Sequence, residues 1–333
     1  MTYQQLRSEI VQKKFRPLYF LAGEEAYFVD ALAQLVEEHA LSEEEKSFNQ
    51  SILYGADTDL PTIIGEAKRY PMMAERVVVI VREAQHLRNF DLLEDYAKNP
   101  QPSTVLVFAY KGKKLDGRKG ITKLLKKSHV YLEFAKLYDN QVPDWIRNNL
   151  QGLGIGIEPK AVLMLSESLG NDLGRVDSEL RKLAGLLKPG QSISPDLVEE
   201  NVGISKDFNN FELCNAINQG QFGKAMRIQA YFAANPKDNP SVLTLSILYR
   251  TFRILMILNQ LKGASQGEMC RAAGVSPHFL PDYLSALPKY NIRKLARIFG
   301  YLRETDMRSK GVNDGGTNDQ ELLKELLFKI FYV

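Results

Sequence analysis

Two short apolar runs, VVVIV at 77–81 and VLVFAY at 105–110, constrain the fold of this 333-residue chain more than any other feature. Every position in both runs is apolar, so neither suits a strand that turns one face to water. Strands of this kind lie in the centre of a parallel sheet, where helices cover both faces. The runs therefore predict an α/β architecture in which strands and helices alternate along the chain.

The remainder of the first 138 residues fits this architecture. Further strand-like segments occur at 17–23, 47–55 and 129–134, and helix-like segments such as 60–70 stand between the strands. With the two apolar runs they give at least five strands. We expect a doubly wound parallel sheet domain over 1–138.

After residue 138 the β-branched runs nearly disappear. Helix-like segments of about 10 to 16 residues follow, separated by glycine and proline. In one of them the apolar residues repeat every three or four positions, which predicts one buried stripe; they are Leu173, Val176, Leu180, Leu183 and Leu187. We predict a small helical domain over 139–205 and a second helical domain over 206–333.

Charge and cysteine content indicate the cellular compartment of the protein and the class of its partners. The 43 basic and 40 acidic residues leave a net charge of +3, which is too small to require a nucleic-acid partner. Cys214 and Cys270 have no second cysteine at metal or redox spacing, which favours a reducing compartment. The most apolar helix-like segment, 242–261, contains Arg250 and Arg253, which are costly inside a membrane. We expect a cytoplasmic protein with no membrane partner.

The first strand is not followed by a phosphate-binding loop. Such a loop needs several glycines and then a lysine and a hydroxyl residue. The segment LAGEEAYFVD keeps only Gly23, and it places Glu24 and Glu25 where an anion would bind. GKKLDGRKG at 112–120 has the glycine spacing, but it lacks the lysine and hydroxyl pair and follows a late strand. We expect no bound nucleotide and no other cofactor.

Other catalytic patterns are also missing from the sequence. Arg82 and Glu83 end the third strand in place of the acidic pair that holds magnesium in active hydrolases. The histidines stand far apart without a second ligand at helical spacing; they are His39, His86, His129 and His278. We therefore predict no catalytic residue and no metal site.

The segment PMMAERVVVIVREA at 71–84 places Met72 and Met73 in the turn before a buried strand, where solvated residues are expected. Loops that enter parallel strands lie at the opposite edge from the ligand crevice of such a sheet. Methionine is flexible and adapts to a partner's groove. The pair either contacts another protein or folds back onto its own core, and the residues alone leave both alternatives open.

Four segments together resemble the delta subunit family of the bacterial DNA polymerase III clamp loader. They are PLYFLAGEEAYFVDAL, PMMAERVVVIVREAQHL, LGNDLGRVDSELRKLAGL, and LYRTFRILMILNQL with LRETDMRSKG. The resemblance implies an AAA+-like domain without hydrolysis, a helical lid domain and a C-terminal helical collar that packs against other loader subunits. It also implies a subunit that binds the sliding clamp and opens its ring for loading onto primed DNA, as part of a polymerase holoenzyme. Met72 and Met73 stand where the family usually has a clamp-binding Leu-Phe pair.

Two alternatives remain beside this resemblance. The segment 265–287 scans like a DNA-binding helix-turn-helix, with Gly274 at the turn. Its second helix, however, has no arginine or lysine before Lys289, so it offers little to bases or phosphates. The other alternative is an active AAA+ ATPase with an unusual loop.

Overall fold

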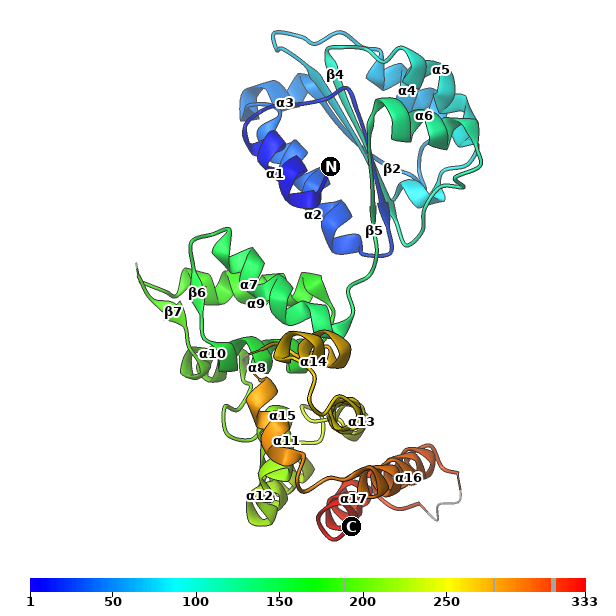
Figure 1. The fold of residues 1–333 in the computed structure, drawn as a ribbon. Coiled ribbons are helices and arrows are strands. Elements are labelled where there is room, and N and C mark those ends of the chain that lie inside the picture. Colours follow the sequence, from blue (N-terminus) through cyan, green and yellow to red (C-terminus); the bar gives the residue numbers. More distant parts are fainter. Residues whose placement is uncertain (189, 278, 313–315) are drawn as a thin grey trace. The chain divides into compact units, whose positions relative to one another are not determined.

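The structure is a computed structural model that describes residues 1–188, 190–277, 279–312 and 316–333. These residues form two compact units, Met1–Leu137 and Tyr138–Val333. Each unit is described by itself below (Figure 1). The further division of the second unit after residue 205 stays a prediction.

The first unit is an α/β domain with a parallel sheet, as expected. Its parallel strands are β1 (Leu18–Gly23), β2 (Gln50–Tyr54), β3 (Val77–Arg82), β4 (Thr104–Lys111) and β5 (Val130–Phe134), in the sheet order β2-β3-β4-β1-β5. Its helices are α1 (Tyr3–Val11), α2 (Ala26–His39), α3 (Glu43–Asn49), α4 (Leu60–Ala67), α5 (Glu94–Lys98) and α6 (Gly120–Ser128), with 3-10 turns η1 (Ala84–His86) and η2 (Phe90–Leu93).

The strand order explains why both faces of the sheet are covered. The chain leaves β1 for the far edge, returns through β3 and β4, and passes β1 to form β5. Because crossovers are right-handed, this reversal puts α2 on one face and α4, α5 and α6 on the other, and α1 packs on the same face as α2 (Figure 1). Val78 and Ile80 pack under the first layer, and Val79 and Val81 under the second. The prediction that VVVIV is buried on both sides is confirmed.

Two element boundaries differ from the sequence prediction near the second strand. The strand expected at 47–55 begins only at Gln50, because α3 extends to Asn49 after a capping box in which Ser42 and Glu45 bond each other's backbone N–H. Helix α4 ends at Ala67 rather than at residue 70. Residues 68–76 therefore form a longer connection into β3 than the sequence suggested.

The second unit is helical, as predicted, apart from one short pair of parallel strands, β6 (Gly156–Ile157) and β7 (Ser192–Ile193). Its first helices are η3 (Asp139–Gln141), α7 (Val142–Gln151), α8 (Pro159–Leu169), α9 (Leu173–Gly185) and α10 (Pro195–Val202). The others are α11 (Asn210–Gln219), α12 (Phe222–Ala234), α13 (Ser241–Gln260), α14 (Gln266–Ala273), α15 (Leu280–Ala286), α16 (Ile292–Ser309) and α17 (Asp319–Phe331). The predicted stripe is buried on α9 except for Leu187, which lies beyond the end of the helix and is half-buried.

Helix α13 is the central helix of the C-terminal core. Phe252 and Leu255 are fully buried against α11, α16 and α17, while Tyr249 faces outward. Within the described residues, α13 is the one helix long and apolar enough to cross a membrane. Half of that stretch is buried inside the unit, and core helices pass the same test, so this is weak evidence for a membrane span.

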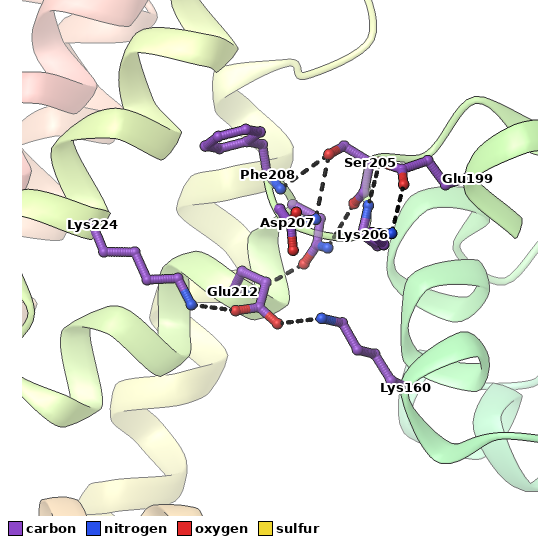
Figure 2. Close-up of polar contacts among 9 residues, drawn as sticks. Lys160, Glu199, Ser205, Lys206, Asp207, Phe208, Glu212 and Lys224 are labelled. Atoms are coloured by element: carbon purple, nitrogen blue, oxygen red, sulfur yellow. Dashed lines mark hydrogen bonds and ion pairs between the residues drawn. The ribbon is translucent and has the colours of Figure 1, made fainter. Parts of the chain in front are cut away.

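A buried carboxylate joins α8 to the helices that follow it (Figure 2). Glu212 on α11 accepts from Lys160 of α8 at 2.8 Å and from Lys224 of α12 at 2.5 Å. The two lysines lower the pKa of the Glu212 carboxyl against the opposing effect of burial. Beside this triad, the backbone N–H of Lys206 donates to Glu199 at 3.1 Å and that of Phe208 donates to the Ser205 hydroxyl at 3.1 Å (Figure 2). These bonds fix the connection between α10 and α11.

A second carboxylate in this unit is much less well compensated. Glu167 of α8 is partly buried, with 11% of its side chain exposed, and it pairs with Arg250 of α13, with 3.9 Å between Oε1 and Nη2. Burial raises the pKa of Glu167 from 4.5 to about 7, although Arg250 opposes the shift. Burial likewise raises the pKa of the neighbouring Cys214 thiol and Tyr283 phenol.

The Glu167→Gln variant should change how stability depends on pH. Between pH 4.5 and 7 the folded protein holds a proton that the unfolded chain has lost. The free energy of unfolding should therefore fall as pH rises through this window, by at most about 1.4 kcal/mol per pH unit. Glutamine does not titrate, so urea unfolding of the variant should give a flatter profile there. Parallel profiles for the two proteins would contradict this assignment.

Candidate functional site

Nucleotides bind at the carboxyl edge of the sheet in this type of fold. At this edge Gly23, the last residue of β1, lies directly against Phe134 of β5. Gly23 has a φ of +139°, and a Cβ placed there would lie 2.1 Å from the carbonyl oxygen of Phe134 on β5. The residue is therefore needed for the close approach of two strands. Strand packing is therefore a sufficient reason for a glycine at this position, and phosphate binding is not needed to explain it.

The N-terminus of α2 is occupied by a side chain of the protein itself. Glu25 is buried, and its Oε1 accepts from the backbone N–H of Tyr27 at 3.3 Å. A helix N-terminus is a common phosphate-binding position in nucleotide-binding α/β folds, because its free N–H groups attract an anion. Here a carboxylate already caps the helix and would repel a polyphosphate. The residues at this position do not fit a nucleotide.

Gly23→Ala should destabilise the first unit. The new Cβ would collide with backbone, and the residue would have to keep a positive φ, so we expect a loss of about 3 kcal/mol or more in the free energy of unfolding. The matched control is Gly65→Ala in α4, where nothing lies within 4 Å of the new Cβ. That change should stabilise by about 0.5 to 1 kcal/mol. Equal effects of both substitutions in urea unfolding would be the contrary result.

The amino edge of the sheet carries the two methionines singled out in the sequence. They lie in a turn at residues 71–74, here called the methionine turn, a few residues before β3. Met73 is fully exposed and Met72 is 56% exposed, while Ala74 is half-buried and packs against the core under α1 and α2. The alternative in which both side chains fold back onto their own core does not describe this structure.

A buried asparagine holds the methionine turn in place. Asn49, at the end of α3, is only 2% exposed. Its Oδ1 accepts from the backbone N–H of Met72 at 2.7 Å, and its Nδ2 donates to the Met72 carbonyl at 2.9 Å. Met73 has a φ of +55°, a left-handed conformation that is uncommon outside glycine and costs roughly 1 kcal/mol. The buried side chain of Asn49 thus fixes the backbone of the turn, while both thioether side chains are exposed to solvent.

Two exposed aromatic residues flank the methionine turn. Phe48 precedes Asn49 on α3 and is 62% exposed, and Tyr70 precedes Pro71 and is also exposed. Arg69 ties the two segments together, since its guanidinium donates to the Phe48 carbonyl at 3.4 Å and to Glu66 at 2.7 Å. We call the exposed residues Phe48, Tyr70, Met72 and Met73 the apolar patch.

Sequence reasoning found the two methionines but missed Asn49, Phe48 and Tyr70. Asn49 stood inside a run interpreted as a strand, and nothing in the sequence indicated that its amide bonds the backbone of Met72. No pattern in the sequence distinguished exposed aromatic residues from the aromatic residues of the core.

The histidines and the helix-turn-helix-like segment considered in the sequence can also be located in the structure. Among the described residues no group of three or more histidine, cysteine or acidic side chains could hold a metal. His278 lies outside the described residues. The helix-turn-helix-like segment does form α14 and α15, but Leu280 and Ala286 of the would-be recognition helix are buried in the hydrophobic core of the unit. That helix is part of the core.

Comparisons with known proteins agree on one family. A sequence model described as DNA polymerase III, delta subunit, matches residues 19–135, and one described as DNA polymerase III delta subunit, C-terminal domain, matches residues 207–330. Together they cover well over half of the chain. Among curated proteins, DNA polymerase III subunit delta of Bacillus subtilis (strain 168) is 26% identical over 324 residues, which are 93% of this chain and 91% of that protein.

Among solved structures, the Bacillus subtilis DNA clamp loader delta protein (YqeN) matches the whole chain. The match covers 100% of both chains with a TM-score of 0.56 and 23% sequence identity. At 23% sequence identity this match shows that the two proteins share a fold.

Proposed function

Because this chain belongs to the family of DNA polymerase III delta subunits, which are clamp-loader components, we propose that it binds a sliding clamp through Met72 and Met73 and opens its ring. The observation that carries the proposal is the pair of exposed methionines held on a fixed backbone by Asn49. The bound clamp would then admit primed DNA in the assembled loader.

The geometry of the methionine turn suits a contact with a macromolecule. It lies at the edge of the sheet opposite Gly23 and Glu25, away from the position of a nucleotide. Its backbone is pre-ordered by two hydrogen bonds, so binding would order only side chains. Burial of both thioether side chains in a hydrophobic groove would contribute about 3 kcal/mol or more.

The proposal also covers contacts with other loader subunits and the lack of nucleotide hydrolysis by this subunit. We propose that residues 206–333 form the collar that contacts other loader subunits, which is supported by the exposed apolar residues Val242 and Tyr249 on α13 and Tyr332 after α17. The carboxylate of Glu25 at α2 supports a subunit that hydrolyses no nucleotide by itself. Its site of action would be the cytoplasm, with the replication machinery.

The double variant Met72→Ala/Met73→Ala should lose most of the affinity for the sliding clamp of the same organism. Removing both side chains from a shared groove should weaken binding by roughly a hundred-fold, from the lost apolar burial. Surface plasmon resonance with immobilised clamp measures the change. The matched control is Leu92→Ala, since Leu92 on η2 has similar exposure to Met72 but lies outside the apolar patch. Clamp affinity that stays at the wild-type level in the double variant would refute the assignment.

Asn49→Ala tests whether the fixed backbone matters apart from the methionines. The substitution removes both hydrogen bonds to Met72, each worth about 1 kcal/mol, and leaves both thioethers present. We expect roughly ten-fold weaker clamp binding, with a circular dichroism spectrum like that of the wild type. If Asn49→Ala binds as tightly as the wild type, pre-ordering of the turn has no part in recognition.

A further inference from the structure

The outer edge of strand β2 has no role in the function proposed above. Within the described residues β2 pairs with β3 alone, so no other strand covers this edge. Two of its side chains, Ile52 and Tyr54, are 37% and 48% exposed. Ile52 is in register with Ile80 of β3, which belongs to the apolar layer between the sheet and α2. The apolar layer therefore reaches the edge of the sheet and is exposed there.

The backbone of β2 presents hydrogen-bonding groups at the same edge. The N–H of Gly55 donates to the carbonyl of Arg82 on β3 at 2.8 Å. Because the polar groups of alternate residues in a strand point to the same side, those of Leu53 also face β3, and those of Ile52 face away from it. The N–H of Tyr54 faces outward too. A strand from another chain could bond these outward groups.

The opposite edge of the sheet is protected against such pairing, whereas β2 is not. Strand β5 carries Glu133, which pairs with Lys126 at 2.9 Å and with Lys114 at 3.9 Å. Charged side chains on an edge strand oppose the addition of another strand. The sequence of β2 is QSILY, which contains no charged residue and no proline. The edge of β2 is therefore the one suited to pairing.

Acidic residues flank β2 on both sides in the chain. Residues 43–59 contain five acidic residues and one lysine, although the whole chain has a net charge of +3. The lysine, Lys46, already pairs with Glu43. Glu44, Asp57 and Asp59 are exposed. This charge would repel a nucleic acid, and pairing of β2 with β2 of a second copy would bring acidic segments together.

These features identify the partner by its chemistry. Peptides that add a strand to a sheet edge gain affinity from main-chain hydrogen bonds and specificity from side chains at alternate positions. Here the alternate side chains on one face of the added strand would lie beside Ile52 and Tyr54. We propose that the outer edge of β2 binds an extended segment of another protein in which apolar residues alternate with lysine or arginine. This contact is separate from the one proposed for the methionine turn.

The test is fluorescence anisotropy of a labelled octapeptide of alternating lysine and valine, titrated with the full-length chain. The peptide should bind saturably, and an octapeptide of alternating glutamate and valine should bind at least about ten-fold more weakly. Methylation of the backbone nitrogens of the lysine peptide keeps its charge and removes its N–H donors, so binding should fall by at least about ten-fold. Equal binding of the methylated and unmethylated peptides would mean charge attraction alone and would overturn the proposal.

The edge variant Ile52→Thr/Tyr54→Thr tests the exposed side chains. Threonine favours strands, so β2 should persist while its apolar surface is lost. Binding of the lysine peptide should weaken by about ten-fold or more. The matched control is Leu92→Thr/Ile292→Thr, which removes two exposed apolar side chains outside the sheet and should bind like the wild type. Wild-type binding by the edge variant, or equal loss in the control, would remove the site.

Clamp binding and oligomeric state separate this edge from other contacts. The edge variant should keep the wild-type affinity for the sliding clamp, and Met72→Ala/Met73→Ala should keep its affinity for the lysine peptide. A loss of clamp affinity in the edge variant would assign β2 to the clamp contact. In analytical ultracentrifugation, a wild-type dimer that dissociates in the edge variant would assign β2 to a second copy of the chain. Either result would overturn the proposal.

Discussion

Burial of one parallel sheet on both faces is the constraint on which the first unit depends. The apolar strands β3 and β4 can exist only between two layers of helices, and those layers leave the two ends of the strands as the accessible edges. At the carboxyl edge, Gly23 lets β5 approach and Glu25 caps α2, so the place of a nucleotide is filled by the protein. We propose that the partner is recognised at the amino edge, where the methionine turn lies.

The methionine turn combines rigidity of the backbone with adaptability of the side chains. Asn49 is buried and bonds both polar groups of the Met72 backbone, which would otherwise need water or another partner. Met73 keeps a left-handed conformation that an isolated chain would rarely adopt. The unbranched thioethers above this support can still fit the shape of a partner's groove. Such a division of roles suits a subunit that acts by binding.

The sequence predicted the features that depend on local residue patterns. It did not predict features that depend on contacts between residues distant in the chain. Unbroken apolar runs identified the buried strands, and the missing glycines, lysine and hydroxyl group indicated the loss of the phosphate loop. The position of Met72 and Met73 before a strand, together with the family resemblance, indicated the residues that we propose for clamp binding. In contrast, Asn49 lay in a segment that reads as a strand, and only its bonds to Met72, distant in sequence, reveal its role.

The most direct measurement of the central claim is methyl NMR of the full-length chain labelled at the methionine methyl groups, titrated with the sliding clamp. The signals of Met72 and Met73, assigned from single substitutions, should shift or broaden as the clamp binds. The signal of Met269, which is buried in the second unit, should stay in place. Binding of the clamp with no change in the Met72 and Met73 signals would contradict the account.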